Sequence, residues 1–299
     1  MLGGRIGGAV LVGTVVVLVV TVAAADRGSA VHARSSHTIN PTTIPLGDGH
    51  VSSTPRRKYV DSCISFPPSQ SQSLPWINSK KKTWNSETKP EVQGSVAWPE
   101  AQYSVTLSGT SRIIETNDLP VNHTTGIFPI SPSDPAYAYD HNPNHIAAHP
   151  TTWTLPADPV AASTPSCTGL GPIGVLSDGI LLFNALDAQG RDAAAHEVQD
   201  SCWGHPDGAD EYHHHDVPSC ILDPATGQST LVGYAIDGYG IYVEKNKEGA
   251  LLTDSNLDAC HGRTSKVMWN GTMTRIYHYD ATLEYPYTVG CFHGTPITH

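Results

Sequence analysis

A ten-residue frame occurs twice in this chain and restricts the folds that are open to it. The frame reads Gly-x-x-x-Asp-Gly-x-x-x-aromatic, from Gly174 to Phe183 and again from Gly233 to Tyr242, with the same offset at both ends (233 − 174 = 242 − 183 = 59). Matching Tyr-His segments and a closing cysteine follow each copy, which defines repeat units 172–220 and 231–291. Two copies are too few for a solenoid. We therefore predict two similar units that face each other across a pseudo-twofold axis.

Composition and patterning favour short strands over helices. The chain has 27 Gly and 23 Pro, which break helices and favour turns. The Asp-Gly pairs inside the two frames fit tight turns, where Gly accepts a positive φ. We predict a mainly β protein: a single β-rich sandwich or barrel-like domain with an internal pseudo-twofold duplication, long loops and few short helices. The expected elements are strands at 95–98, 103–107 and 112–116, a long loop at 131–166, a short helix at 191–198 and a surface loop at 244–256.

The N-terminal segment has the features of a secretory signal. Arg5 precedes an apolar run from Ile6 to Val22, and the three alanines that follow fit a cleavage site. We predict a signal peptide at 1–25, a flexible linker at 26–60 and a β-rich domain at 61–299. Cleavage would give a secreted or extracellular protein without membrane insertion, whereas an uncleaved run would anchor it to a membrane.

The cysteines and two sequons fit an extracellular protein. Six cysteines without a Cys-x-x-Cys pair indicate disulfides rather than a metal motif. The triplets that begin at Asn122 and Asn270 fit the N-glycosylation rule for a eukaryotic glycoprotein. The symmetry of the repeat predicts one disulfide within each unit and a third outside them: Cys202–Cys220, Cys260–Cys291 and Cys63–Cys167.

Charge and motifs exclude several classes of function. The formal net charge is −11, and the one cationic cluster, Lys80 to Lys82, reads as a solvated loop, so we expect no nucleic-acid partner. The chain has no Gly-x-Ser-x-Gly elbow, His-Glu-x-x-His helix, Walker loop or dinucleotide fingerprint. A triad of scattered Ser, His and Asp remains open, because triads are recognised by geometry.

Histidines in the two repeat units form the strongest candidate site. Alternation along a strand places His213 and His215 on one face, with His214 on the other. The second unit supplies His278 and Asp280 from the matching position. If the units pair face to face, these side chains converge on one shared site. His214 would then point away and tolerate replacement.

Imidazoles with a carboxylate are ligands for divalent transition metals, zinc or copper above all. His123, in a polar Asn-His-Thr context, is a further candidate ligand. We expect His205 and His261, which neighbour Cys202 and Cys260, to lie outside the ligand set or at the surface.

At this point the chain resembles the YHYH domain family, named for a Tyr-His-Tyr-His signature. The first signature here has His214 in place of Tyr, and the second has Asp280 in place of His. The resemblance spans roughly 95–294 and rests on the following segments: Phe183–Asp192, Asp200–Cys202, Gly204–His205, Tyr212–His215 with Pro218 and Cys220, Asp237–Tyr242, Leu257–Cys260, Tyr277–Tyr279, Tyr285–Tyr287 and Gly290–Cys291.

The resemblance implies a mostly secreted domain with a suspected metal site and no settled activity. Three functions fit the residues. The first is a secreted or cell-surface metal-binding domain with an extracellular partner or matrix component. The second is a metal-dependent oxidoreductase or hydrolase at the same site, aided by neighbouring tyrosines. The third is a metal-free structural or glycan-binding module. A closed four-ligand site favours the first function and a three-ligand site in a cleft the second.

Overall fold

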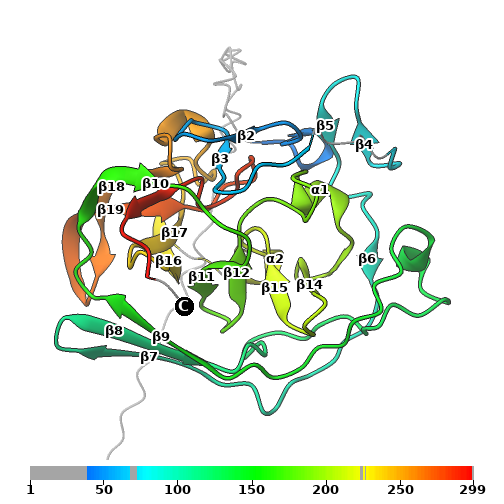
Figure 1. Ribbon diagram of the computed structural model, residues 1–299, viewed down its shortest axis with the longest axis horizontal. Helices are drawn as coiled ribbons and strands as arrows, with labels where there is room; N and C mark the ends of the chain where they lie inside the picture. The colour runs from blue at the N-terminus through cyan, green and yellow to red at the C-terminus, as the bar shows by residue number, and fades with distance from the viewer. Residues whose placement is uncertain (1–38, 68–72, 223–224, 226, 298–299) are drawn as a thin grey trace, which may run out of the picture. The chain divides into compact units, whose positions relative to one another are not determined.

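Strands that extend from both copies of the repeated frame lie side by side in one central sheet. The computed structural model describes residues 39–67, 73–222, 225 and 227–297, all within the unit Ser36–His299. The order across the sheet, right to left in Figure 1, is β14-β15-β12-β11-β16-β17-β19-β18. The bounds are β11 Pro172–Leu176, β12 Leu181–Phe183, β14 Gly204–Pro206, β15 Tyr212–His214, β16 Ser229–Ala235, β17 Gly240–Glu244, β18 Gly262–Trp269 and β19 Thr272–Asp280.

The order of this sheet reads the same from both edges. In each half an antiparallel hairpin is followed by a parallel pair and then by an antiparallel edge pair. The halves meet where β11 runs antiparallel to β16, and there Val175 lies opposite Tyr234, the residue 59 positions later. Gly179 and Gly238 turn the two hairpins with φ of 90° and 92°. This pairing is what twofold-related units would have, although a duplication as the origin of the chain stays a prediction.

The predicted packing of the two units face to face is wrong. The units adjoin edge to edge in a single sheet, because residues 174–176 of β11 pair with residues 233–235 of β16. The mainly β class with few short helices is confirmed. The described helices are α1 Ala193–His196, which lies within the predicted segment, α2 Ser219–Leu222, and the 3₁₀ turns η1 Pro41–Thr43, η2 Pro135–Ala138 and η3 Asp254–Asn256.

A three-stranded sheet packs against the first unit. It has the order β7 (Tyr103–Ser108), β8 (Ser111–Thr116), β9 (Thr151–Pro156), and it lies at the lower left of Figure 1. Its buried Ile114, Trp153 and Leu155 cluster with Val175 and Leu181 of the central sheet. The loop expected at 131–166 therefore contains a strand that contributes to the core, as well as β10 (Ala161–Ser166), which pairs with β20 (Phe292–Gly294).

Residues 39–60, the described part of the segment predicted as a linker at 26–60, contain short strands. The chain there forms β1 (Ile44–Pro45), β2 (Val51–Ser52) and β3 (Val60–Asp61), and it continues to β4 (Ile77–Asn78) and β5 (Thr83–Trp84). Apolar side chains scattered among prolines and serines explain the order: Ile44 and Val60 are buried in a cluster with Trp76 and Trp84. The signal peptide predicted at 1–25 lies outside the described residues. No helix in the described part of the chain is long and apolar enough to cross a membrane.

Three disulfides cross-link the fold, and all three predicted pairs are confirmed. Two lie within the repeat units, and the third ties the N-terminal strands to the segment before β11; the pairs are Cys202–Cys220, Cys260–Cys291 and Cys63–Cys167. A further short strand pair, β6 (Glu91–Val92) with β13 (Gln199–Asp200), is parallel.

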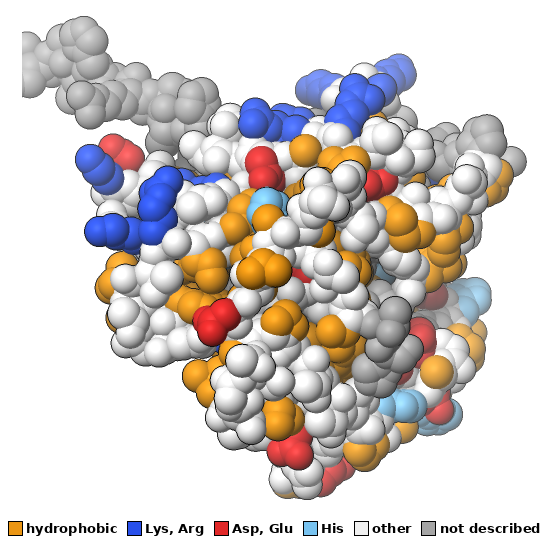
Figure 2. Space-filling view, turned by 60° about the vertical axis from the view of Figure 1, so that its left-hand side comes forward, with side chains coloured by type: hydrophobic (Ala, Val, Ile, Leu, Met, Phe, Trp, Pro, Cys, Tyr) orange, Lys and Arg blue, Asp and Glu red, His pale blue; other side chains and the backbone are white. Residues whose placement is uncertain are grey.

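Lys and Arg side chains gather at the top of the face in Figure 2, the end where Figure 1 shows β2 to β5. Lys80 to Lys82 are exposed there, as expected for a solvated loop.

Candidate metal centre

Three histidines come together at one end of the central sheet. The antiparallel pair β14–β15 places His205 directly opposite His213, and strand alternation puts His215 on the same face. One ring nitrogen from each of the three lies within 4.8 Å of the others. All three side chains are buried, with exposed fractions between 3% and 7%. Three imidazole nitrogens so close together match the spacing of ligands around a metal ion.

Main-chain carbonyls fix the orientation of two of these rings. The Nδ1 atom of His213 lies 3.1 Å from the carbonyl oxygen of Glu211, and that of His215 lies 2.5 Å from the carbonyl oxygen of Asn184. A carbonyl only accepts hydrogen bonds, so both Nδ1 atoms carry the hydrogen and donate it. Each neutral ring then has its lone pair on Nε2, as metal-binding histidines have.

The two Nε2 atoms face each other. They lie 3.2 Å apart, and with both lone pairs directed into the gap they repel unless a proton or a cation lies between them. Two imidazoles that bind one zinc ion tetrahedrally at about 2.0–2.1 Å hold their nitrogens about 3.3–3.4 Å apart. The observed separation is therefore close to that of two ligands on one ion.

Glu197, the residue after α1, adds a carboxylate to the cluster. Its Oε2 atom lies 3.2 Å from Nε2 of His205 and 3.0 Å from Nε2 of His215. Among the described residues, neither Oε2 of Glu197 nor Nε2 of His205 has a hydrogen bond of acceptable geometry, although both atoms are buried. Buried polar atoms without hydrogen bonds are costly, so both are suited to a bound cation.

The charges of the cluster depend on this carboxylate. Burial raises the pKa of Glu197, but His215 and His205 together outweigh it and hold that pKa well below its usual value. Burial, with His205 and His215 nearby, holds the pKa of His213 well below its usual value. Burial also lowers the pKa of His215, yet Glu197 reverses this and leaves it raised. At neutral pH the cluster thus has an ionised carboxylate and a neutral His213.

The histidines line a cleft of about 690 Å³. One wall is apolar and includes Phe183, whose ring stacks on His213 with 4.2 Å between centroids. Five acidic residues also line it, and no Lys or Arg is among the described lining residues. The residues that line it besides the three histidines and Phe183 include Leu170, Pro172, Leu186, Asp140, Asp187, Glu197, Asp207 and Glu211. The site therefore opens into a space sized for a small molecule, with walls that disfavour anions.

His278 and Asp280 do not join this site, so the expectation of one shared centre is not met. They lie on β19, separated from β15 by β12, β11, β16 and β17. At about 4.8 Å per strand, the two strands are roughly 24 Å apart along the sheet. His278 and Asp280 instead form their own buried cluster with Glu244, which the sequence had assigned to a surface loop. The physical reason is the edge-to-edge arrangement of the units, which places matching strands at opposite ends.

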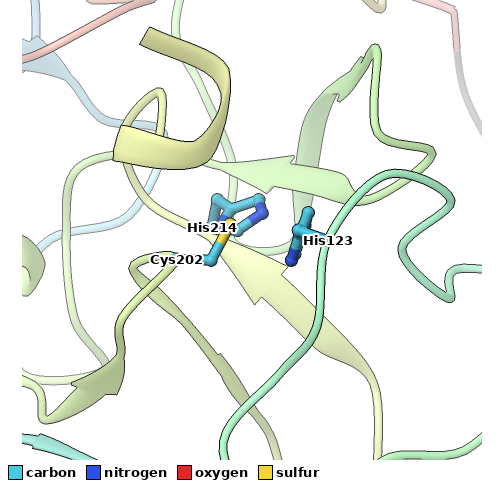
Figure 3. A group of neighbouring side chains, drawn as sticks. All are labelled: His123, Cys202 and His214. Atoms are coloured by element: carbon cyan, nitrogen blue, oxygen red, sulfur yellow. The ribbon is translucent and has the colours of Figure 1, made fainter. Parts of the chain in front are cut away.

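His123 lies on the opposite face of β15, beside His214 (Figure 3). Both rings contact one buried carboxylate: Nε2 of each lies 3.1 Å from Oδ2 of Asp178. Burial raises the pKa of Asp178, but the two histidines outweigh it and lower that pKa, while Asp178 raises the pKa of His214 despite burial. Cys202 lies nearby but is bonded to Cys220, so it offers no thiolate. His123 is therefore not part of the three-histidine cluster.

His214 is not the replaceable residue that strand alternation suggested. It is fully buried, and its Nδ1 atom donates to the carbonyl oxygen of Trp203 at 3.0 Å. His261 is also buried rather than at the surface, between Asp254 (3.2 Å) and the hydroxyl of Thr282 (3.1 Å). Both residues have partners on each ring nitrogen, so both stabilise the fold.

Sequence reasoning missed His205 and Glu197. A signal for His205 was present: Pro206-Asp-Gly-Ala-Asp210 is a turn sequence between two short strands, and a hairpin there brings His205 opposite His213. No comparable signal marked Glu197, because its place depends on how α1 packs against the sheet.

Comparisons with known proteins support the family resemblance over part of the chain. The model of the YHYH protein family matches residues 152–251, a third of the chain, so the resemblance is confirmed over a shorter span than predicted. The match contains Glu197, His205, His213, His215 and Glu244, but not His278 or Asp280 on β19. No match was found among curated proteins or among solved structures.

Proposed function

We propose that this protein binds a divalent transition-metal ion, zinc or copper, through His205, His213 and His215. The observation that supports this most strongly is the orientation of His213 and His215. Both Nδ1 hydrogens are committed to carbonyl oxygens, and both Nε2 atoms meet at 3.2 Å. Imidazole nitrogen suits zinc and copper better than calcium or magnesium, which prefer oxygen.

Glu197 completes the proposed site. Its carboxylate faces two of the three rings and supplies negative charge beside the ion. Its side chain is 22% exposed, more than any of the three histidines, so it lies on the cleft side of the cluster. Here it can bind the ion as a fourth ligand or accept a hydrogen bond from a water on the ion.

The cleft favours an enzyme as the second candidate function. Three histidine ligands leave a coordination position open, and an open position next to a cleft is the arrangement of catalytic metal sites. A bound ion would lower the pKa of a water there and so supply a nucleophile at neutral pH. The acidic lining disfavours anionic substrates, so we propose neutral or cationic small molecules as ligands of the cleft.

We further propose that the protein acts outside the cytosol, on an extracellular partner or matrix component. The three disulfides support this, because such bonds persist in oxidising compartments. The acidic net charge of −11 gives no support to a nucleic-acid partner.

The test is the metal content of the secreted protein, purified without chelator, measured by elemental analysis. We expect about one zinc or copper ion per chain. The variant His213→Ala should lose the ion, whereas His145→Ala should keep it, because His145 is exposed and outside the cluster. Unchanged metal content in folded His213→Ala, or no ion in the native protein, would favour the metal-free structural alternative.

A further inference from the structure

The end of the sheet that carries His278 repeats the pairing of the three-histidine end. In the first half, Gly204 lies opposite His214 and His205 opposite His213. In the second half, Gly262 lies opposite Tyr279 and Arg263 opposite His278. By this register Arg263 occupies the position of His205, and Asp280 occupies that of His215.

Hydrogen bonding confirms the correspondence of the central histidines. His213 donates from Nδ1 to the carbonyl oxygen two residues earlier, Glu211, at 3.1 Å. His278 makes the same bond to Ile276, also at 3.1 Å. Each ring therefore presents Nε2 to the cluster, and for His278 the nearest carboxylate atom is Oε2 of Glu244 at 3.1 Å. Glu244 also contacts Arg263, as Glu197 contacts His205, so each cluster has a carboxylate beside the residue at the His205 position.

The two ends differ in charge type at two positions, because Arg263 replaces His205 and Asp280 replaces His215. Its Nε atom lies 2.7 Å from Oε2 of Glu244 and 4.0 Å from Oδ2 of Asp280. Asp280 is fully buried, and neither of its carboxylate oxygens has a hydrogen-bond partner among the described residues. A guanidinium is permanently positive and cannot bind a metal ion. It offsets the charge of the Glu244 carboxylate as a cation would.

We infer that Glu244, His278 and Asp280 are arranged as a divalent-metal site that is closed in the native chain, because Arg263 takes the position of a ligand and supplies the positive charge of an ion. The native chain therefore binds no ion at this end. Replacement of Arg263 by His restores a four-residue donor set of two imidazoles and two carboxylates, which suits zinc or cobalt. The inference uses the first cluster as its template, so it rests on the proposed function for the comparison, but its test does not.

The experiment compares Arg263→His with the native chain and with Arg263→Lys, the control that retains the charge. Arg263 is 34% exposed on the edge strand β18, so the side chain can change without opening the core. Each protein is titrated with Co²⁺ and followed by its visible absorption, after circular dichroism has shown the native fold. We expect Arg263→His to bind about one ion more than the native chain, and Arg263→Lys to equal the native chain.

A further change identifies the ligands. The extra ion should be lost in Arg263→His/Glu244→Gln, which removes a carboxylate of the second cluster and leaves the first cluster intact. An extra ion in Arg263→His above a native content of zero would support this inference while contradicting the proposed function. If Arg263→His does not fold, Arg263→Gln takes its place, with weaker but measurable extra binding expected. No extra ion in the folded variant, or an ion at His278 in the native chain, overturns the inference.

Discussion

The Nε2 atoms of His213 and His215 lie 3.2 Å apart, while both Nδ1 atoms are held by main-chain carbonyl oxygens. The carbonyls of Glu211 and Asn184 belong to separate segments, so the backbone orients both rings before any ion binds. Preorganised ligands lose less freedom on binding, which favours affinity. The pair is thus the element of the fold that most directly supports a metal centre.

Loss of the carboxylate should weaken binding without abolishing it. Glu197→Gln removes the negative charge that faces His205 and His215. We expect metal affinity to fall by roughly 10–100-fold. Competition with a chromophoric chelator measures this, and Glu100→Gln, at an exposed position, serves as the control. Equal affinity in Glu197→Gln and the native chain would remove Glu197 from the site.

Metal binding should weaken as the pH falls. Ligation needs unprotonated imidazole, and Glu197 raises the pKa of His215 above its ordinary value of about 6.5. His213 has a lowered pKa and stays neutral to lower pH. Competition with protons should therefore begin at His215, above about pH 6.5. In Glu197→Gln the onset should move to lower pH; an unchanged pH profile would contradict this assignment.

The Asp178–His214 pair should stabilise the fold in a defined pH window. His214 has a raised pKa, so its contribution is complete below about pH 6.5 and is lost as the pH rises through its folded-state pKa. Asp178 has a lowered pKa, so its contribution is present above about pH 3.9 and is lost as the pH falls through its folded-state pKa. Asp178→Asn should cost about 3 kcal/mol between these limits and less at pH 9.

Chemical denaturation at pH 5.5 and pH 9 measures that difference. The exposed Glu87→Gln provides a control, for which we expect little change at either pH. A cost for Asp178→Asn that is the same at both pH values would mean that the buried pair is not ionised.

The disulfides should contribute according to the loops they close. Cys63–Cys167 spans 104 positions and Cys202–Cys220 spans 18. Replacing both cysteines by serine should cost about 5 kcal/mol for the first pair and about 3 kcal/mol for the second. Denaturant unfolding of the two double variants tests the order, and thiol titration of the denatured, unreduced native protein should detect no free thiol. The reverse order would point to strain or residual structure in the unfolded chain.

The repeat predicted the local structure of the two units but not how they meet. The positive-φ turns at Gly179 and Gly238 and the disulfides within the units follow from local sequence and symmetry. A repeat implies a symmetry axis without locating it. Antiparallel pairing of β11 with β16 places the axis between these two strands and perpendicular to the sheet, which separates His213 from His278. Packing between distant segments decides how the two units meet, and no periodicity in the sequence predicts that packing.

Other parts of the fold depend on isolated residues. Ile44 and Val60 lie in segments rich in polar residues and prolines, yet both are buried, so residues 39–60 belong to the folded unit. His205 and Glu197 reach the site through a short hairpin and a one-turn helix. Elements this short carry almost no hydrophobic pattern, because a strand of three residues shows a single alternation.

X-ray absorption at the metal edge of the native protein tests the central claim most directly. We predict scattering from three imidazole nitrogens at about 2.0–2.1 Å, with an oxygen ligand and no sulfur, and loss of one imidazole shell in His205→Ala. A protein that holds no ion, or an ion surrounded by oxygen alone, would contradict the proposed centre.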